Sequence, residues 1–195
     1  RRSSRTPAGR RLRTRRAPRE SPAAMRPRRP ERRGVAVSPR PEGGPPAPDL
    51  RVARVVEARE HPDADRLIVL RVDLGDEERQ IVAGLVGHYA PAELEDLDLV
   101  VVANLKPATL RGELSEGMLL AAEDGEGNLG VLLAEGAEPG TRLAPTGAGE
   151  PADEITFDEF HENALLARPG EVTLNGEPLL GADLRMDREV HGRLR

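Results

Sequence analysis

Short apolar runs bounded by turn-forming residues are the feature that most constrains the fold of this chain. In residues 66–74, Ile68, Leu70, Val72 and Leu74 recur at every second position. This spacing has the period of a β-strand rather than that of a helix. Further short apolar runs lie at residues 50–58, 81–83, 99–103, 118–122 and 130–134. The pattern predicts an all-β fold of five or six short strands.

Proline and glycine mark the connections between these strands. Pro91 predicts one short helix that extends to about Leu97, because proline is tolerated in a first helical turn. Residues 125–130, GEGNLG, match the G-x-G-x-x-G spacing of dinucleotide-binding proteins. That motif requires a helix after it, whereas the VLLAE that follows is typical of a strand. We therefore interpret residues 125–130 as a β-turn.

Charge is distributed unevenly along the chain. Residues 1–48 hold 15 arginines and three glutamates, a net charge of +12, whereas residues 49–195 hold 14 basic and 31 acidic residues, a net charge of −17. The first segment, rich in arginine and proline, is predicted to be disordered because it has too few apolar residues to form a core. It is either a basic arm that adds affinity for phosphates or translated upstream sequence at the edge of a fragment, since Met25 lies inside it.

Composition and spacing disfavour several functional classes. Cysteine is absent, so no disulfide or thiolate metal site can form. No apolar run approaches 18 residues, which predicts a cytoplasmic protein without a membrane span. Ser115 lies outside a G-x-S-x-G elbow, and no nucleophile and base stand at a recognisable spacing. We therefore predict no enzymatic activity and no cofactor.

The segment from His61 to Asp65, HPDAD, offers an imidazole and two carboxylates that a metal ion could use. Pro62 and the two aspartates equally favour a turn that joins two strands. We favour the turn and predict no metal site.

The segment between the apolar runs 99–103 and 118–122 contains the most distinctive polar side chains. It includes Lys106, the one lysine of the chain, together with Asn104, Arg111 and Ser115. These side chains can contact phosphates and bases. They are equally typical of a solvated loop, which is the structure that Pro107, Gly112 and Gly117 predict.

Residues 104–118, NLKPATLRGELSEGM, resemble the signature of the tRNA-binding domain family. That family includes methionyl-tRNA synthetase C-terminal domains, free-standing tRNA-binding proteins and EMAP-II-like proteins. Residues 49–75 and 81–94 resemble the preceding segments of the family, in the same order. The resemblance implies a five-stranded OB-fold barrel with one short helix over residues 49–145, which binds tRNA.

The same resemblance assigns RNA contact to five positions of the central segment: Asn104, Lys106, Arg111, Ser115 and Met118. Arg66 and Arg71, on the second predicted strand, are candidate helpers. Many members of the family carry basic residues where this chain has Ala108 and Thr109, so the electrostatic attraction is reduced here. With an aromatic content of 2%, we expect shape and phosphate contacts to dominate over base stacking.

Residues 151–195 resemble, more loosely, the small, mainly β C-terminal module of EMAP-II-like proteins. Asn175-Gly176 within it is a strong hairpin signal. In those proteins the module packs on the barrel and replaces the second subunit of a dimer, so the resemblance implies a monomer. The alternative is an ordinary β-extension that has no bearing on oligomeric state.

Two functional hypotheses follow from these observations. The first is a module that holds tRNA by its shape and backbone, with an aminoacyl-tRNA synthetase, methionyl in particular, as its partner. It would act in trans or be a detached appendage of the enzyme. The alternative is a protein-interaction or chaperone-like module, which would need an exposed apolar groove and a dimeric state.

Overall fold

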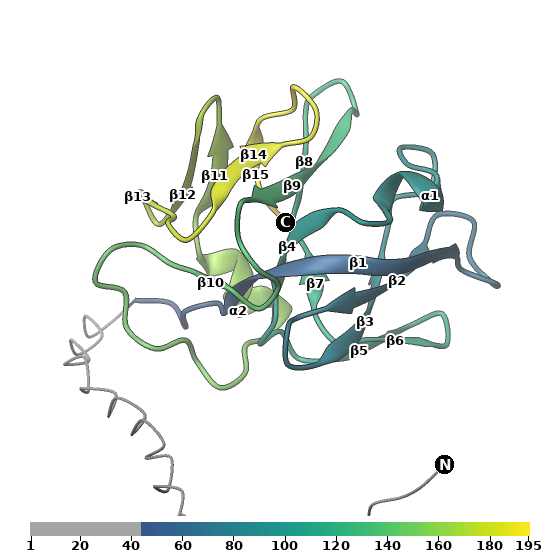
Figure 1. Cartoon of the computed structure of the whole chain (residues 1–195), viewed down its shortest axis with the longest axis horizontal. Helices are drawn as coiled ribbons and strands as arrows, with labels where there is room; N and C mark the ends of the chain where they lie inside the picture. Colours follow the sequence, from purple (N-terminus) through teal and green to yellow (C-terminus); the bar gives the residue numbers. More distant parts are fainter. Residues whose placement is uncertain (1–43) are drawn as a thin grey trace, which may run out of the picture. The chain divides into compact units, whose positions relative to one another are not determined.

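The computed structural model describes residues 44–195, which form an almost entirely β structure (Figure 1). The arm predicted for residues 1–48 lies outside the described residues, apart from residues 44–48. No helix among the described residues is long and apolar enough to cross a membrane. The predicted all-β class is confirmed.

A central sheet is built around the long strand β1. Its main strands are β1 (Leu50–Glu60), β2 (Ile68–Asp73), β3 (Glu78–Ala83), β4 (Asp98–Val102) and β9 (Leu129–Glu135). One edge of β1 pairs with β4, and the other pairs with β2 and with the short β10 (Arg142–Leu143). The register shifts between Val55 and Glu57, and a bulge of this kind bends a strand so that it can serve different neighbours along its length.

The strand β4 is buried on both of its faces. Leu99 and Val101 pack into the barrel interior with Ile68 and Leu70 of β2. Val100 and Val102 point to the opposite face, into a second core that contains Phe160 and other residues of the C-terminal module. This double burial explains why the β4 sequence is continuously apolar rather than alternating.

The predicted helix α1 (Pro91–Leu94) lies between β3 and β4 and is shorter than expected. Pro91 begins it, as predicted. It ends at Leu94 because Glu95 is extended, with φ of −61° and ψ of 144°, and Asp96 then adopts a left-handed conformation with φ of 63°.

The segment 104–118, predicted to be a loop, contains a β-hairpin instead. Its strands are β5 (Ala108–Leu110) and β6 (Glu113–Ser115), joined by Arg111 and Gly112 with φ of 52° and 100°. Gly112 indicated a turn, but arginine is unusual at a positive φ, so Arg111-Gly112 did not indicate a hairpin. The run 118–122, predicted as one strand, is divided into β7 (Met118–Leu119) and β8 (Ala121–Glu123), which pair with β4 and β9 respectively.

The GEGNLG segment forms the turn between β8 and β9, as interpreted from the sequence. The Asp124 carboxylate accepts hydrogen bonds from the backbone N–H groups of Glu126 and Asn128, both at 2.9 Å. These bonds lower the pKa of Asp124, with the Asn128 amide as the largest cause. A strand follows the turn, so the helix that a dinucleotide site requires does not occur here.

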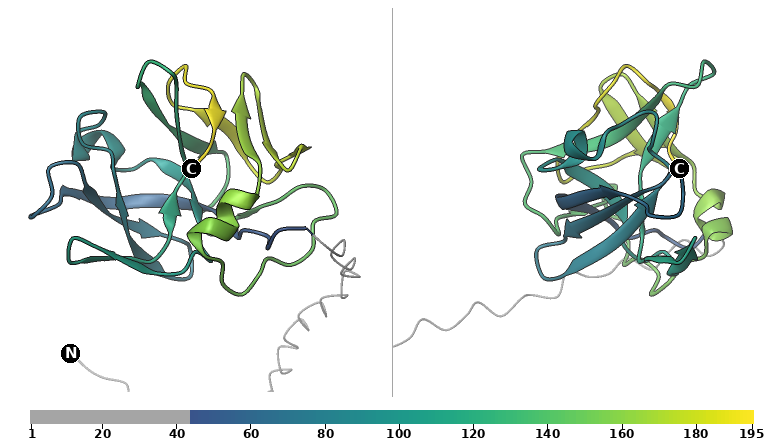
Figure 2. Two further views of the ribbon diagram at one scale, coloured as in Figure 1. Left: turned by 180° about the vertical axis from the view of Figure 1, so that it is seen from behind. Right: turned by 90° about the vertical axis from the view of Figure 1, so that its right-hand side faces the viewer.

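The C-terminal residues add a second, four-stranded sheet and one helix. The elements of this C-terminal part are α2 (Phe157–Glu162), β11 (Leu165–Arg168), β12 (Glu171–Leu174), β13 (Glu177–Pro178), β14 (Asp183–Met186) and β15 (Gly192–Arg193). The predicted hairpin at Asn175-Gly176 joins β12 to β13. The four-stranded sheet has the order β13-β12-β11-β15, whereas β14 pairs with β9 of the central sheet (Figures 1 and 2). The helix α2 was not predicted.

A polar cluster also fastens the C-terminal residues to the central sheet. The Tyr89 hydroxyl donates a hydrogen bond of 2.7 Å to Asp187, whose other oxygen accepts from the Val131 N–H at 2.8 Å. The Arg188 guanidinium stacks 3.9 Å above the Tyr89 ring. Burial and the Asp187 carboxylate raise the pKa of Tyr89, so this phenol stays protonated as a donor.

Because the second core is shared, we expect the central sheet and the C-terminal residues to unfold together. Phe160→Ala should lower the free energy of unfolding by about 3–5 kcal/mol, the usual cost of truncating a buried phenylalanine. Phe157→Ala is the matched control, since Phe157 is 54% exposed and Phe160 is 1% exposed; its cost should be below about 1 kcal/mol. Urea unfolding followed by circular dichroism measures both. Two separate transitions, of which Phe160→Ala shifts one alone, would contradict the shared core.

Candidate nucleic-acid interface

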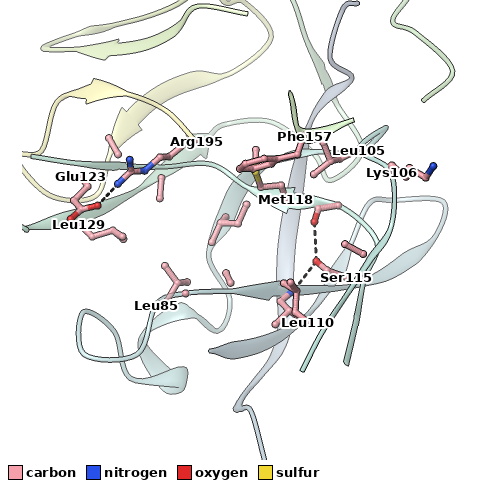
Figure 3. Close-up of a pocket in the computed structure, with 18 residues that line it drawn as sticks. Leu85, Leu105, Lys106, Leu110, Ser115, Met118, Glu123, Leu129, Phe157 and Arg195 are labelled. Carbon is pink, nitrogen blue, oxygen red and sulfur yellow. Dashed lines mark hydrogen bonds and ion pairs between the residues drawn. The ribbon is translucent and has the colours of Figure 1, made fainter. Parts of the chain in front are cut away.

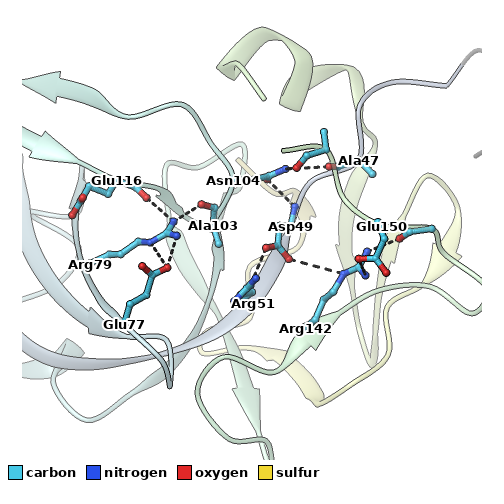
Figure 4. Close-up of polar contacts among 12 residues, drawn as sticks. Ala47, Asp49, Arg51, Glu77, Arg79, Ala103, Asn104, Glu116, Arg142 and Glu150 are labelled. Atoms are coloured by element: carbon cyan, nitrogen blue, oxygen red, sulfur yellow. Dashed lines mark hydrogen bonds and ion pairs between the residues drawn. The ribbon is translucent and has the colours of Figure 1, made fainter. Parts of the chain in front are cut away.

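Asn104 fastens the start of the central segment to two other parts of the chain (Figure 4). Its side-chain oxygen accepts a 2.8 Å hydrogen bond from the Asp49 N–H. Its side-chain nitrogen donates to the carbonyls of Ala152 at 2.8 Å and Ala47 at 3.3 Å. Both ends of the amide are therefore engaged within the protein, and the role of Asn104 in RNA contact stays a prediction.

Arg79 of β3 holds the two ends of the segment together, also in Figure 4. Its guanidinium donates to the carbonyl of Ala103, before the segment, and to that of Glu116 at 3.3 Å, near its end. Glu77 forms an ion pair with the same guanidinium. Sequence reasoning missed this residue, because nothing near it in the chain indicates a contact with residues 24 and 37 positions away.

The tip of the β5–β6 hairpin is joined to the turn between β1 and β2. The buried ring of His61 lies with Nε2 3.1 Å from the Leu110 carbonyl oxygen, while Nδ1 is 3.0 Å from the Asp63 N–H. Nδ1 therefore accepts and Nε2 donates. HPDAD forms the predicted turn, and both ring nitrogens are engaged in hydrogen bonds, one within the turn and one to the hairpin. Within residues 44–195, no group of three or more potential metal ligands occurs.

Ser115 is buried and Met118 is half-buried. The Ser115 hydroxyl accepts from the Val82 N–H at 3.0 Å and donates to the Gly117 carbonyl at 2.9 Å, which fastens β6 to β3. Met118 packs against the second core and also borders a groove. Contact of either residue with RNA stays a prediction.

The absence of ion pairs distinguishes three of the four basic candidates from most other arginines of the described chain. Within residues 44–195, five basic side chains have no carboxylate within 4.0 Å: Arg66, Lys106, Arg111, Arg168 and Arg193. Three of these five are predicted RNA contacts. An unpaired cation can neutralise a phosphate without first losing a carboxylate partner.

Arg71, by contrast, is paired with two glutamates. Its guanidinium lies 2.7 Å from Glu78 and 3.0 Å from Glu57. Hydrogen bonds to Glu78 and Glu57 raise its pKa above the ordinary value for arginine. Arg71 therefore offers less to a phosphate than Arg66, which lies nearby at the start of the same hairpin.

An apolar groove of about 560 Å³ adjoins the central segment (Figure 3). Leu85, Leu105, Met118, Leu129 and Phe157 supply most of its large apolar side chains. Lys106 lies at one end with its amine directed outward, and Leu105 lies between it and Phe157; the ion pair of Glu123 with Arg195 lies at the other end.

Phe157 is the groove residue that sequence reasoning missed. It is the first residue of α2, and the helix begins with a capping box in which Thr156 and Glu159 satisfy each other's backbone N–H groups. Thr-Phe-Asp-Glu is a recognisable helix-start signal. It could have located α2, and hence Phe157, from the sequence.

Asn104→Ala should reduce the free energy of unfolding by about 1–3 kcal/mol, because it leaves the Asp49 N–H and the Ala152 carbonyl without partners. Thermal unfolding measures the loss. Asn128→Ala is a control, since Asn128 lies in an exposed turn and bonds only to Asp124 through its side chain. Unchanged stability combined with weaker RNA binding would assign Asn104 to the RNA directly.

Comparisons with known proteins agree with this geometry. The profile of the family described as "Putative tRNA binding domain" matches residues 50–142. The chain is 55% identical over 87 residues to the methionine–tRNA ligase of Methanocaldococcus jannaschii, and 52% identical over 96 residues to that of Bacillus subtilis. These alignments cover 45% and 49% of this chain but 13% and 14% of the two relatives. The chain thus spans a small part of their length.

A solved structure resembles more of the chain. The C-terminal domain of Plasmodium vivax p43 superposes with a TM-score of 0.68 and 28% identity, and the match covers 76% of this chain and 97% of that domain. The likeness therefore extends beyond the residues that the family profile matches. Residues 50–142 of this chain thus match the tRNA-binding domain family.

Proposed function

We propose that residues 49–195 bind tRNA by its shape and backbone and serve an aminoacyl-tRNA synthetase, with methionyl-tRNA synthetase as the favoured partner. Residues 49–145 would supply the OB-fold, and residues 151–195 the accessory module. The module would act in trans or as an appendage of the enzyme, without catalysis of its own. The match of residues 50–142 to the family profile and the similarity to methionine–tRNA ligases support this proposal.

The observation that carries the proposal is the set of unpaired cations around the β5–β6 hairpin. Lys106 precedes β5, and Arg111 occupies the hairpin tip. Arg66 follows the turn between β1 and β2. The hydrogen bond of His61 to the Leu110 carbonyl joins that turn to the hairpin tip. In a segment with a net charge of −17, these side chains offer phosphates a local attraction that the rest of the surface opposes.

The double variant Lys106→Ala/Arg111→Ala should weaken tRNA binding about equally for different tRNAs. The slope of log affinity against log salt should become shallower by about 2, because two phosphate contacts are lost. Filter binding over a salt series measures both effects. Arg71→Ala is the matched control, and its effect should be smaller because two glutamates already neutralise this arginine. Undiminished binding by the double variant would refute the assignment of the site.

We also propose that the chain is a monomer. The strand β14 occupies the edge of β9, and the C-terminal residues cover the outer face of β4, both of which a second copy could otherwise use. Light scattering coupled to size exclusion should give the mass of one chain. A dimer mass would contradict this proposal and would leave the tRNA proposal intact.

A protein-interaction or chaperone-like module remains the second candidate function. The groove beside Met118 and Phe157 favours it, because an exposed apolar groove can take an apolar peptide. The monomeric state proposed above disfavours it, since that hypothesis expects a dimer. Competition between peptide and RNA for the groove distinguishes the two candidates.

A further inference from the structure

The groove contains the one aromatic side chain of this protein that is available for stacking. The chain has no tryptophan, one tyrosine and two phenylalanines, all within the described residues. Tyr89 and Phe160 are 6% and 1% exposed, whereas Phe157 is 54% exposed. An exposed phenylalanine in a chain so poor in aromatic residues is a feature that packing does not explain.

Backbone hydrogen bonds fix Phe157 beside the unpaired lysine. The Lys106 N–H donates to the Ile155 carbonyl at 2.8 Å, and the Ile155 N–H donates to the Asn104 carbonyl at 2.9 Å. Residues 104–106 and residue 155 thus form a short parallel bridge. The capping box at Thr156 then starts α2, which brings Phe157 to the rim of the groove.

The Phe157 ring contacts a neighbouring ring and also lines the groove. The His161 ring packs against it edge to face, with centroids 4.3 Å apart. Figure 3 shows Met118 beneath the ring and Leu105 beside it, and both line the groove. A ring held in this way loses little side-chain freedom when a planar ligand stacks on it.

The combination of a stacking ring, an apolar groove and a neighbouring cation matches the chemistry of a nucleotide. A base has an apolar face, and the phosphate attached to it is anionic, so the two parts suit Phe157 and Lys106 respectively. The groove volume of about 560 Å³ lies within the range of small-ligand sites. A base inside a duplex cannot reach such a ring, because its faces are covered by neighbouring bases.

We propose that the groove holds one unpaired nucleobase of the bound RNA, stacked on Phe157, with the adjacent phosphate at Lys106. This proposal rests on the proposed function and adds the RNA feature that is recognised. It limits stacking to a single base, which agrees with the low aromatic content. The duplex parts of a tRNA would contact the cations around the β5–β6 hairpin, and the groove would select RNAs that present an unpaired base at the right distance.

Substitutions of Phe157 in the full chain test the stacking contact. Phe157→Ala and Phe157→Leu should each weaken binding of a tRNA transcript by about 5- to 150-fold, the usual range for loss of one stacked base. Phe157→Tyr should retain binding. Leu180→Ala is the matched control, because Leu180 is similarly exposed, at 52%, and does not line the groove. Wild-type affinity for both the Ala and the Leu variants would overturn the proposal while leaving the proposed function standing.

Fluorescence gives a second, independent measurement. Because the chain lacks tryptophan, Phe157→Trp introduces a single indole at the groove. Its emission should be quenched by a tRNA transcript and by a short unstructured RNA oligonucleotide. A blunt-ended RNA duplex should not quench it, even at concentrations at which the duplex is bound to the protein. Equal quenching by the duplex would overturn the proposal. Quenching by an apolar peptide, with none by the oligonucleotide, would also overturn it and would assign the groove to protein binding.

The two proposals fail in different ways. Two results together would refute the proposed function and support a single-strand site in the groove: the wild-type chain does not bind tRNA, and the oligonucleotide still quenches the Phe157→Trp variant. tRNA binding that depends on Lys106 and Arg111 but not on Phe157 would refute the groove proposal alone.

Discussion

The hydrogen bonds of the Asn104 amide are the constraint on which the arrangement of the other parts depends. One side chain joins the start of β1, the residues before α2 and the strand-to-hairpin junction after β4. Through this junction the β5–β6 hairpin and Phe157 keep fixed positions relative to each other. Asn104, which the sequence suggests as an RNA contact, thereby stabilises the protein from within. The positions of the exposed hairpin and of Phe157 depend on it.

The burial of β4 has a similar organising effect on the hydrophobic interior. A strand in which apolar and polar residues alternate can leave its polar face in water. In β4 both faces are apolar, so Val100 and Val102 must be covered as well as Leu99 and Val101. The C-terminal residues provide that cover through Phe160 and its neighbours. The accessory sheet therefore completes the interior of the protein as well as extending its surface.

The strands could be predicted from the sequence because alternation and turn residues act locally, as for Ile68 and Leu70 or for Asn175-Gly176. The β5–β6 hairpin could not, because its turn places Arg111 at a positive φ that local propensity disfavours. The unpaired cations Lys106 and Arg66 were identified as candidates. The neutralisation of Arg71 by two glutamates could not be predicted, because it depends on the pairing of β2 with β1 and β3, which only the fold defines.

Within residues 44–195, the pairing of most arginines with carboxylates also bears on how long a bound RNA stays in place. A protein that presents many free cations holds RNA through numerous phosphate contacts, and dissociation then requires all of them to break. Among residues 44–195, only a few cations, Lys106 and Arg111 among them, are free to make such contacts. We therefore expect rapid exchange of RNA at this part of the surface.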